Sequence, residues 1–396
     1  MSRLKTLVLS SIDYLTLYLC RYNLPPVLPI LMALYQMSHG DVGALASAGL
    51  VSYAIMLFPA GLLGDTIGPK RVIIIGNIIS SLSNIAFSFS TLTTPLLGFS
   101  IGLVIQFLNG LGQGMVWGPL TRLVSDLYSK DSEAMGLAMS LLLLPANVGP
   151  TVAYVLSGYL AMDYSWRTSF LFPSFLLLVV TGIFWLSIKD PSNRHRIDSS
   201  KDSLVTRERI RLILFDRNVW LVALAYACYM GIFRGLLAWL PTYLTEKIHM
   251  SPFQASILGG LSTLTGAGSM FIGAWLTGVE FKRRFKFAMA ISFALSAPAL
   301  WILPYTVEEN MVLVMFSLIF AFLGFGGSIY FTYSPIFLPK EAVGTASGFI
   351  DGVAYIGGFV GVLAIGIAYD VFLSYAPAFA FLTLMAGSGM VIALLI

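Results

Sequence analysis

The sequence predicts an all-α membrane protein in which twelve transmembrane helices form two pseudo-symmetric six-helix bundles. Hydrophobic residues make up 57 % of the 396 residues and charged residues only 11 %, whereas about a quarter of the residues in soluble domains are charged. The mean hydropathy is +0.85. The second half repeats the first at a shift of 213 residues, which carries Arg21 onto Arg234 and Lys70-Arg71 onto Arg283-Arg284.

Twelve apolar runs reach the length of about 20 residues that an α-helix needs to cross a bilayer. Each is expected to be a helix, because lipid cannot satisfy the polar groups of an open backbone. In chain order the predicted spans are residues 5–34, 41–63, 71–92, 95–125, 134–160, 168–188, 212–244, 252–278, 285–306, 311–338, 342–369 and 374–396.

The first span begins in a segment that resembles a signal peptide, with two positive charges and an apolar run. It lacks a small-residue cleavage site, and the apolar pattern continues through Arg21, so it is predicted to be a retained helix. An arginine at the centre of a membrane helix costs about 2.5–3.5 kcal/mol and normally faces a polar cavity or a partner. Because Arg234 repeats the feature in the seventh span, the two arginines predict one central anion site.

The chain divides at its only long polar segment, residues 189–211, which carries Pro, Ser and charges of both signs. The predicted domains are an N-terminal bundle over 1–188, this linker, and a C-terminal bundle over 212–396. Gly158 and Gly366 are further equivalent positions of the repeat, here at a shift of 208 residues. Repeats of this kind are the architecture of two-bundle transporters, whose substrate site lies between the halves near the midplane.

The distribution of positive charge predicts the topology. Nearly all of the 23 Lys and Arg fall in the termini or in the loops on their side of the membrane, whereas the opposite side has only Arg167 and Lys247. The positive-inside rule therefore places both termini in the cytoplasm, in a multi-pass protein of the plasma membrane. No basic surface is left for nucleic acid. Cys20 and Cys228 lie within spans, and the three histidines are predicted in loops, so neither a metal site nor a cofactor is expected.

The turn after the second span carries a specific motif, Gly61-Leu-Leu-Gly64-Asp65-Thr-Ile-Gly68-Pro69-Lys70-Arg71. It resembles the signature loop of the major facilitator superfamily between helices two and three. The glycines allow a tight turn, and Asp65 can accept hydrogen bonds from a helix N-terminus. Asp65, Lys70 and Arg71 are therefore predicted gating residues.

A narrower resemblance, to the organophosphate:phosphate antiporter and anion:cation symporter families, covers most of both halves. The residues that carry it are Tyr14, Tyr18, Arg21 and Asn23; Gly114, Trp117, Pro119 and Arg122; Asn147, Val148 and Gly149; Arg234, Trp239, Pro241, Thr242, Tyr243 and Leu244; and Gly344, Gly348, Tyr355, Gly357 and Gly358. The resemblance implies that Arg21 and Arg234 bind the anion, with Tyr14, Tyr18 and Tyr355 around it. A guanidinium group fits phosphate or carboxylate through two parallel hydrogen bonds.

Two departures from that family pattern concern the substrate. The second span has no lysine between Asp41 and Asp65, and Ala146 stands where the family has a histidine. A phosphate dianion would meet less positive charge here, so a monoanion such as a carboxylate is an alternative substrate.

The sequence also places Asp13 and Asp351 in spans where the family pattern shows glycine. A buried carboxylate loses solvation when charged, which favours its protonated form, so both are candidates for proton coupling. Other interpretations remain: Asp13 and Asp351 could pair with the arginines, and Asp13 could be wetted near the interface. Gln106, Asn109 and Gln113 form a polar stripe that either lines the cavity or bonds to neighbouring helices.

Three classes of function follow. The favoured one is a monomeric secondary transporter of a small organic or inorganic anion, driven by exchange or by protons. A proton-coupled multidrug exporter or a carrier of small peptides is the alternative, although two central arginines would repel cationic drugs. For a membrane enzyme or sensor, the sequence offers no phosphate loop, metal cluster or nucleophile with its base.

Overall fold

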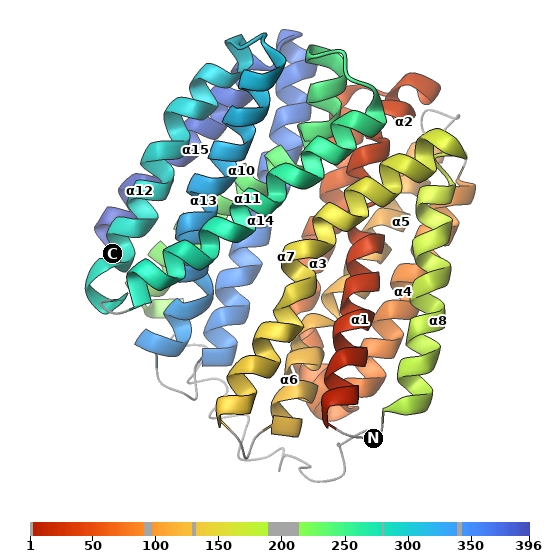
Figure 1. Cartoon of the computed structure of the whole chain (residues 1–396), viewed down its shortest axis with the longest axis vertical. Helices are drawn as coiled ribbons and strands as arrows, with labels where there is room; N and C mark the ends of the chain where they lie inside the picture. Colours follow the sequence, from red (N-terminus) through yellow and green to blue (C-terminus); the bar gives the residue numbers. More distant parts are fainter. Residues whose placement is uncertain (1–2, 91–96, 129–131, 189–213, 279–280, 339–342) are drawn as a thin grey trace. The chain divides into compact units, whose positions relative to one another are not determined.

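The computed structural model describes residues 3–90, 97–128, 132–188, 214–278, 281–338 and 343–396 (Figure 1). The α-helices are α1 (Arg3–Arg21), α2 (Leu28–Tyr35), α3 (His39–Thr66), α4 (Pro69–Phe89), α5 (Leu97–Gly114), α6 (Trp117–Tyr128), α7 (Ser132–Asp163), α8 (Thr168–Ser187), α10 (Arg217–Lys247), α11 (Pro252–Gly278), α12 (Phe281–Ile302), α13 (Glu309–Phe337), α14 (Val343–Phe372) and α15 (Ala376–Leu395). Twelve stretches of the described residues are long and apolar enough to cross a membrane. The predicted fold class is confirmed.

The predicted linker, residues 189–211, lies outside the described residues, and the division into 1–188 and 212–396 stays a prediction.

Two of the predicted spans are each made of two helices. The first breaks between α1 and α2, where a short 3-10 helix, Pro25–Val27, begins with two prolines. The other breaks between α5 and α6, because Pro119 has no N–H to donate to the carbonyl of Met115. His39, predicted in a loop, is the first residue of α3.

The chain folds into two compact units, and two helices are shared between them. The first unit contains the described residues of 3–36, 48–188 and 252–260, and the second contains those of 37–47, 214–251 and 261–396. The shared segments, 39–47 of α3 and 252–260 of α11, occupy equivalent positions at the shift of 213 residues. The residues Gln36 and His249, also equivalent, both have positive φ, 52° and 62°. The sequence repeat is therefore also a repeat of local backbone structure.

In the first unit, α1 packs against α7, α8 and α4. Its contact with α7 is close at Gly149, where an added Cβ would lie only 2.7 Å from the Cβ of Tyr18. Any larger residue at this position of α7 would displace Tyr18, which is one of the predicted substrate residues.

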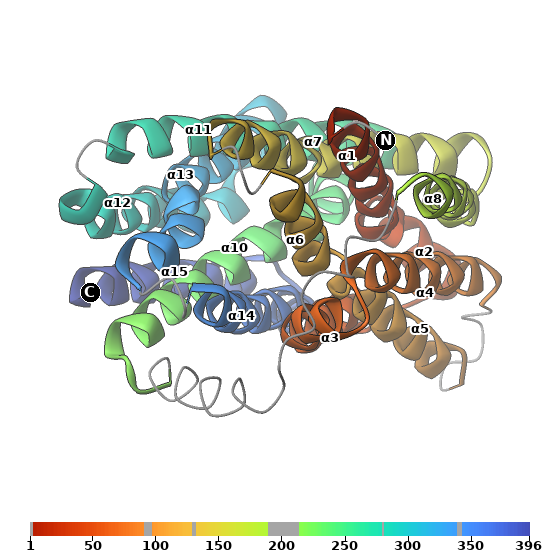
Figure 2. The same ribbon diagram turned by 90° about the horizontal axis from the view of Figure 1, so that it is seen from below.

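In the second unit, α10 is the most enclosed helix, and α14 lies against it (Figure 2). Their backbones meet at two glycines of α14. A Cβ at Gly357 would collide with the carbonyl oxygen of Ala227, and one at Gly361 with that of Gly231. The indole of Trp239 in α10 donates to the carbonyl oxygen of Val362 in α14 at 2.9 Å. This contact fixes the relative position of the two helices that carry Arg234 and Tyr355.

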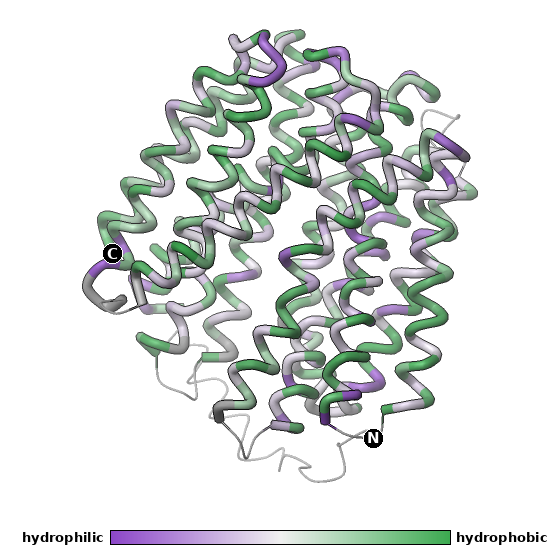
Figure 3. Tube along the Cα trace, viewed as in Figure 1, coloured by the Kyte–Doolittle hydropathy of each residue, from purple (hydrophilic) through white to green (hydrophobic). Residues whose placement is uncertain are grey.

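Apolar residues cover long stretches of the helices, and hydrophilic residues gather mainly near helix ends and at a few interior positions (Figure 3). Several large apolar side chains are highly exposed, among them Leu186, Trp275 and Leu384. Apolar surface on this scale is typical of side chains that face lipid.

Candidate functional site

Arg21 is the last residue of α1, and side chains from three helices hold its guanidinium group. Its Nε donates to Gln113 Oε1 of α5 at 3.0 Å. Its guanidinium carbon lies 4.8 Å from the ring centre of Tyr18 and 4.6 Å from that of Tyr53 in α3. These distances are typical of cation–π interactions, and a cation at the C-terminus of a helix also interacts favourably with the helix dipole.

The two predicted tyrosines of α1 lie at different distances from this arginine. Tyr18 contacts the guanidinium directly. Tyr14 packs edge-on against Tyr18, with ring centres 5.0 Å apart, and stacks on Trp117 at 5.2 Å. The structure thus brings Tyr18 to Arg21, whereas Tyr14 lies one ring further along the aromatic stack.

A buried polar network is connected to Arg21 through Gln113. Gln113 Nε2 donates to Asn109 Oδ1 at 2.8 Å, and the same oxygen accepts from Ser80 Oγ at 2.7 Å and from Asn84 Nδ2 at 3.1 Å. Asn23 in turn donates to Asn84 Oδ1 at 2.9 Å. The stripe that includes Asn109 and Gln113 therefore bonds to neighbouring helices and positions Arg21 through Gln113.

Asp13 has no exposed surface. Both of its carboxylate oxygens lie 2.9 Å from Asn77 Nδ2 of α4, which donates to them. The alternative in which Asp13 is wetted near the interface is wrong.

In the second unit, Arg234 of α10 is 8 % exposed. Its Nη2 donates to the hydroxyl oxygen of Tyr355 in α14 at 2.9 Å, and its guanidinium carbon lies 5.1 Å from the centre of that ring. The structure therefore brings together Arg234 and Tyr355, which the sequence separates by 121 residues.

Asp351 lies one helical turn before Tyr355 on the same face of α14 and is half-buried. It is close enough to Tyr226 of α10 to interact with it electrostatically. Asp351 is therefore a carboxylate one helical turn from the tyrosine that accepts a hydrogen bond from Arg234.

The predicted gating residues surround the turn between α3 and α4. Gly68 has a φ of 94°, and Pro69 begins α4, so the predicted tight turn is confirmed. Lys70 is half-buried and Arg71 is exposed in the first turn of α4. Asp65 belongs to α3, but its side chain lies outside the described part of the chain.

Sequence reasoning missed one partner of Arg21. Tyr53 lies in the middle of an apolar helix, where an isolated tyrosine gives no signal. Gln113 was visible as part of a stripe with helical spacing, but that spacing does not say which residue the stripe contacts.

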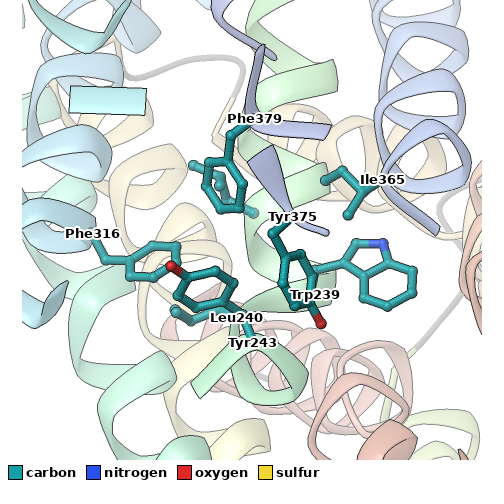
Figure 4. A pocket seen from close by; sticks show the side chains of 8 residues that line it. Trp239, Leu240, Tyr243, Phe316, Ile365, Tyr375 and Phe379 are labelled. Carbon is teal, nitrogen blue, oxygen red and sulfur yellow. The ribbon is translucent and has the colours of Figure 1, made fainter. Parts of the chain in front are cut away.

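Eight apolar and aromatic side chains line a small pocket in the second unit, between α10, α13, α14 and α15 (Figure 4). The lining residues are Leu236, Trp239, Leu240, Tyr243, Phe316, Ile365, Tyr375 and Phe379. None of them carries a charge at neutral pH, so this pocket does not suit an anion.

Comparison with known proteins gives a family and many relatives, among them two transporters of Bacillus subtilis. Residues 12–362 match the profile of the Major Facilitator Superfamily. A glycerol-3-phosphate transporter of Bacillus subtilis (strain 168) is 26 % identical over 379 residues, which cover 90 % of this chain and 83 % of the relative. A hexuronate transporter of the same strain is 23 % identical over 388 residues, which cover 91 % of this chain and 87 % of the relative.

A solved structure is also similar. It is the inward-facing, occupied crystal structure of a bacterial homologue of the human lysosomal transporter Spinster. The TM-score is 0.81 with 16 % identity, over 99 % of this chain and 96 % of the other. At this identity the likeness concerns the fold alone.

Proposed function

Because this chain belongs to the Major Facilitator Superfamily, we propose that it is a secondary transporter that carries a small organic anion, a phosphate ester or a carboxylate, by alternating access. The observation that carries the proposal is the pair Arg21 and Arg234. They occupy equivalent positions in the two repeats, and a tyrosine ring packs on each guanidinium group.

Permanently charged groups in membrane helices are costly to keep without a function. A guanidinium group keeps its charge at every physiological pH and presents a planar set of donors that matches carboxylate and phosphate. In this proposal Arg21 and Arg234 bind the anion, with Tyr18 and Tyr355 in contact with them and Tyr14 behind Tyr18. The similarity to carriers of glycerol 3-phosphate and of hexuronate supports an anionic cargo.

Within the anions, we favour a monoanionic carboxylate. The second span has no lysine between Asp41 and Asp65, and Ala146 replaces a histidine of the family pattern. The two guanidinium groups carry two positive charges. A carboxylate substrate and one ionised acidic side chain neutralise these charges, whereas a phosphate dianion with the same side chain would leave an excess of negative charge.

The same arrangement supports proton coupling through Asp351. This carboxylate lies one turn from Tyr355, whose hydroxyl accepts a hydrogen bond from Arg234, so its charge and the anion would act on the same guanidinium. Asp13 is the second candidate. If neither Asp351 nor Asp13 couples transport to protons, exchange of one anion for another is the remaining mechanism.

We further propose that the protein works as a monomer in the plasma membrane, with both termini in the cytoplasm and with Asp65, Lys70 and Arg71 at the cytoplasmic gate. The asymmetry of positive charge between the loops supports this orientation. A carrier of this kind needs no catalytic residues.

Thermal unfolding of the purified chain with a panel of ligands tests the function. The panel is glycerol 3-phosphate, inorganic phosphate, glucuronate, a dipeptide and a lipophilic cation. A ligand at about 100 times its dissociation constant stabilises the folded state by about 2.7 kcal/mol. We expect stabilisation by anions in the wild type and none in Arg21→Ala or Arg234→Ala.

The matched control is Arg217→Ala, because Arg217 is an exposed residue of the same helix as Arg234. It should respond to anions as the wild type does. Stabilisation by the lipophilic cation alone, or an unchanged anion response in both arginine variants, would contradict the proposal of an anion carrier. The multidrug exporter would then be the favoured function.

A further inference from the structure

A histidine lies between two carboxylates at the first turn of α3, within the second unit. His39 Nε2 lies 3.0 Å from Glu246 Oε2 of α10, and His39 Nδ1 lies 3.4 Å from Asp370 Oδ1 of α14. The His39 side chain is 13 % exposed, and the two acids are about one third exposed. These residues, here called the His39 cluster, are separate from the residues proposed to bind the anion.

The backbone of α3 takes part in the same contact. The N–H groups of His39 and Gly40 donate to Asp370 Oδ1 at 3.0 Å and Oδ2 at 2.6 Å. Asp370 therefore caps the N-terminus of α3 from another helix, where a negative charge also interacts favourably with the helix dipole. An added Cβ at Gly40 would lie 2.8 Å from Asp370 Oδ2, so glycine is needed for this approach.

Aromatic residues enclose the ring of His39. Tyr369 stacks on it with ring centres 3.7 Å apart, and Trp239 stacks at 5.7 Å. The hydroxyl of Tyr375 donates to Glu246 Oε2 at 2.6 Å. Burial and the negative charge of Glu246 raise the pKa of Tyr375 well above its usual value, so this hydroxyl stays a donor.

The two ring nitrogens of His39 face acceptors. A neutral imidazole carries one N–H, and only the protonated ring carries two. A carboxylate accepts hydrogen bonds and cannot donate them. Both contacts of the ring are therefore favourable at the same time only when the ring is protonated, and one of them is lost when it is neutral.

We propose that the His39 cluster is a proton-binding latch, in which protonation of His39 holds the first turn of α3 against α10 and α14. The titratable groups around the ring are Glu246 from α10, Tyr369 and Asp370 from α14, and Tyr375, which precedes α15. This proton site is distinct from the anion site and from the coupling acids proposed above.

The latch concerns the shared end of α3. In the first unit, the described contacts of the equivalent segment of α11 include uncharged groups of α7. Thr151 Oγ1 of α7 donates to the carbonyl oxygen of Gly260 at 2.9 Å, and Gly158 of α7 lies against Ser256. The rest of α3, residues 48–66, belongs to the first unit. Because carriers of this fold move one bundle against the other, protons at His39 would oppose that movement at the shared end of α3.

Hydrogen–deuterium exchange of the full chain in detergent tests the latch without any substrate. Exchange in peptides over 37–47 and 252–260 is compared at about pH 5.5 and about pH 8, on either side of the range in which histidine changes charge. Rates are corrected for the intrinsic effect of pH. We expect the protection of 37–47 to fall by roughly fivefold at the higher pH, as for the loss of one partly exposed ion pair. The protection of 252–260 should not change.

In His39→Gln the protection of 37–47 should be the same at both pH values. Glu246→Gln serves the same purpose if His39→Gln gives no folded protein, because it removes one of the two acceptor charges. The latch is overturned by a wild-type peptide 37–47 with equal protection at both pH values, by an equal change in 252–260, or by a pH response that survives in the folded variant.

Discussion

At the scale of single residues, Arg21 and Arg234 are oriented by different partners. A glutamine oxygen fixes Arg21 through Nε, whereas a tyrosine hydroxyl accepts from a terminal nitrogen of Arg234. A bond through Nε fixes the plane of the guanidinium group without using the two terminal nitrogens that bind carboxylates side by side. Gln113 is therefore a positioning residue for the proposed anion site.

Replacing Gln113 by Leu should weaken anion binding by about tenfold, because Arg21 loses the acceptor that orients it. Gln113→Glu keeps an acceptor but adds a negative charge, so it should weaken binding more. The dissociation constant from the thermal-unfolding series measures both. Gln106→Leu is the control on the same helix, because Gln106 accepts a long bond of 3.4 Å from Asn109, whereas Gln113 accepts from Arg21 itself. Equal losses in Gln106→Leu and Gln113→Leu would contradict the positioning role.

Asn77→Leu should destabilise the folded protein by about 2 kcal/mol, because Asp13 stays fully buried and loses the amide that donates to both of its oxygens. The double variant Asp13→Leu with Asn77→Leu should recover most of this loss, since neither the buried carboxylate nor the buried amide is then left without the other. Chemical unfolding in detergent of the wild type, the two single variants and the double variant gives the four free energies of unfolding for a double-mutant cycle. A double variant as unstable as the sum of the two single variants would show that the pair does not interact.

At the scale of helices, the contact between α10 and α14 depends on glycines that let the two backbones meet. Gly361→Val should cost about 1–3 kcal/mol or more, because the new side chain collides with the carbonyl of Gly231. The control is Gly352→Ala in the same helix, where nothing lies within 4 Å of an added Cβ, so its effect should stay within about 1 kcal/mol. The yield and melting temperature of the two variants measure this difference. Equal melting temperatures for Gly361→Val and Gly352→Ala would contradict a requirement for close contact between the two backbones.

The helices were largely predictable from the sequence, because twelve apolar runs and one repeat determine them. The breaks within two of the spans were not predicted, because each of these spans is one continuous apolar run. Pro25, Pro26 and Pro119 are the residues that could have indicated them. The partners of His39 could not be predicted, because they follow it by 207 and 331 residues. Likewise, the spacing of Asn109 and Gln113 identified their shared face but not the helices that this face contacts.

At the scale of the whole molecule, the proposed coupling predicts how transport responds to a proton gradient. Asp351→Asn should abolish gradient-driven accumulation of the anion in proteoliposomes while leaving exchange of internal for external anion in place, because exchange needs no proton. Asp13→Asn tests the second candidate in the same assay, since Asp13 bonds to Asn77. Gradient-driven uptake that is unchanged in Asp351→Asn would remove Asp351 from this role.

The shared ends of α3 and α11 also bear on how such a chain arises. Each predicted six-helix half carries one helix end that packs in the compact unit built mainly from the other half. An ancestral chain of six helices with this feature would complete its packing by exchanging that end with a second, identical copy, which is the defining property of a domain-swapped dimer. Duplication and fusion of its gene would then join two subunits that already depended on each other.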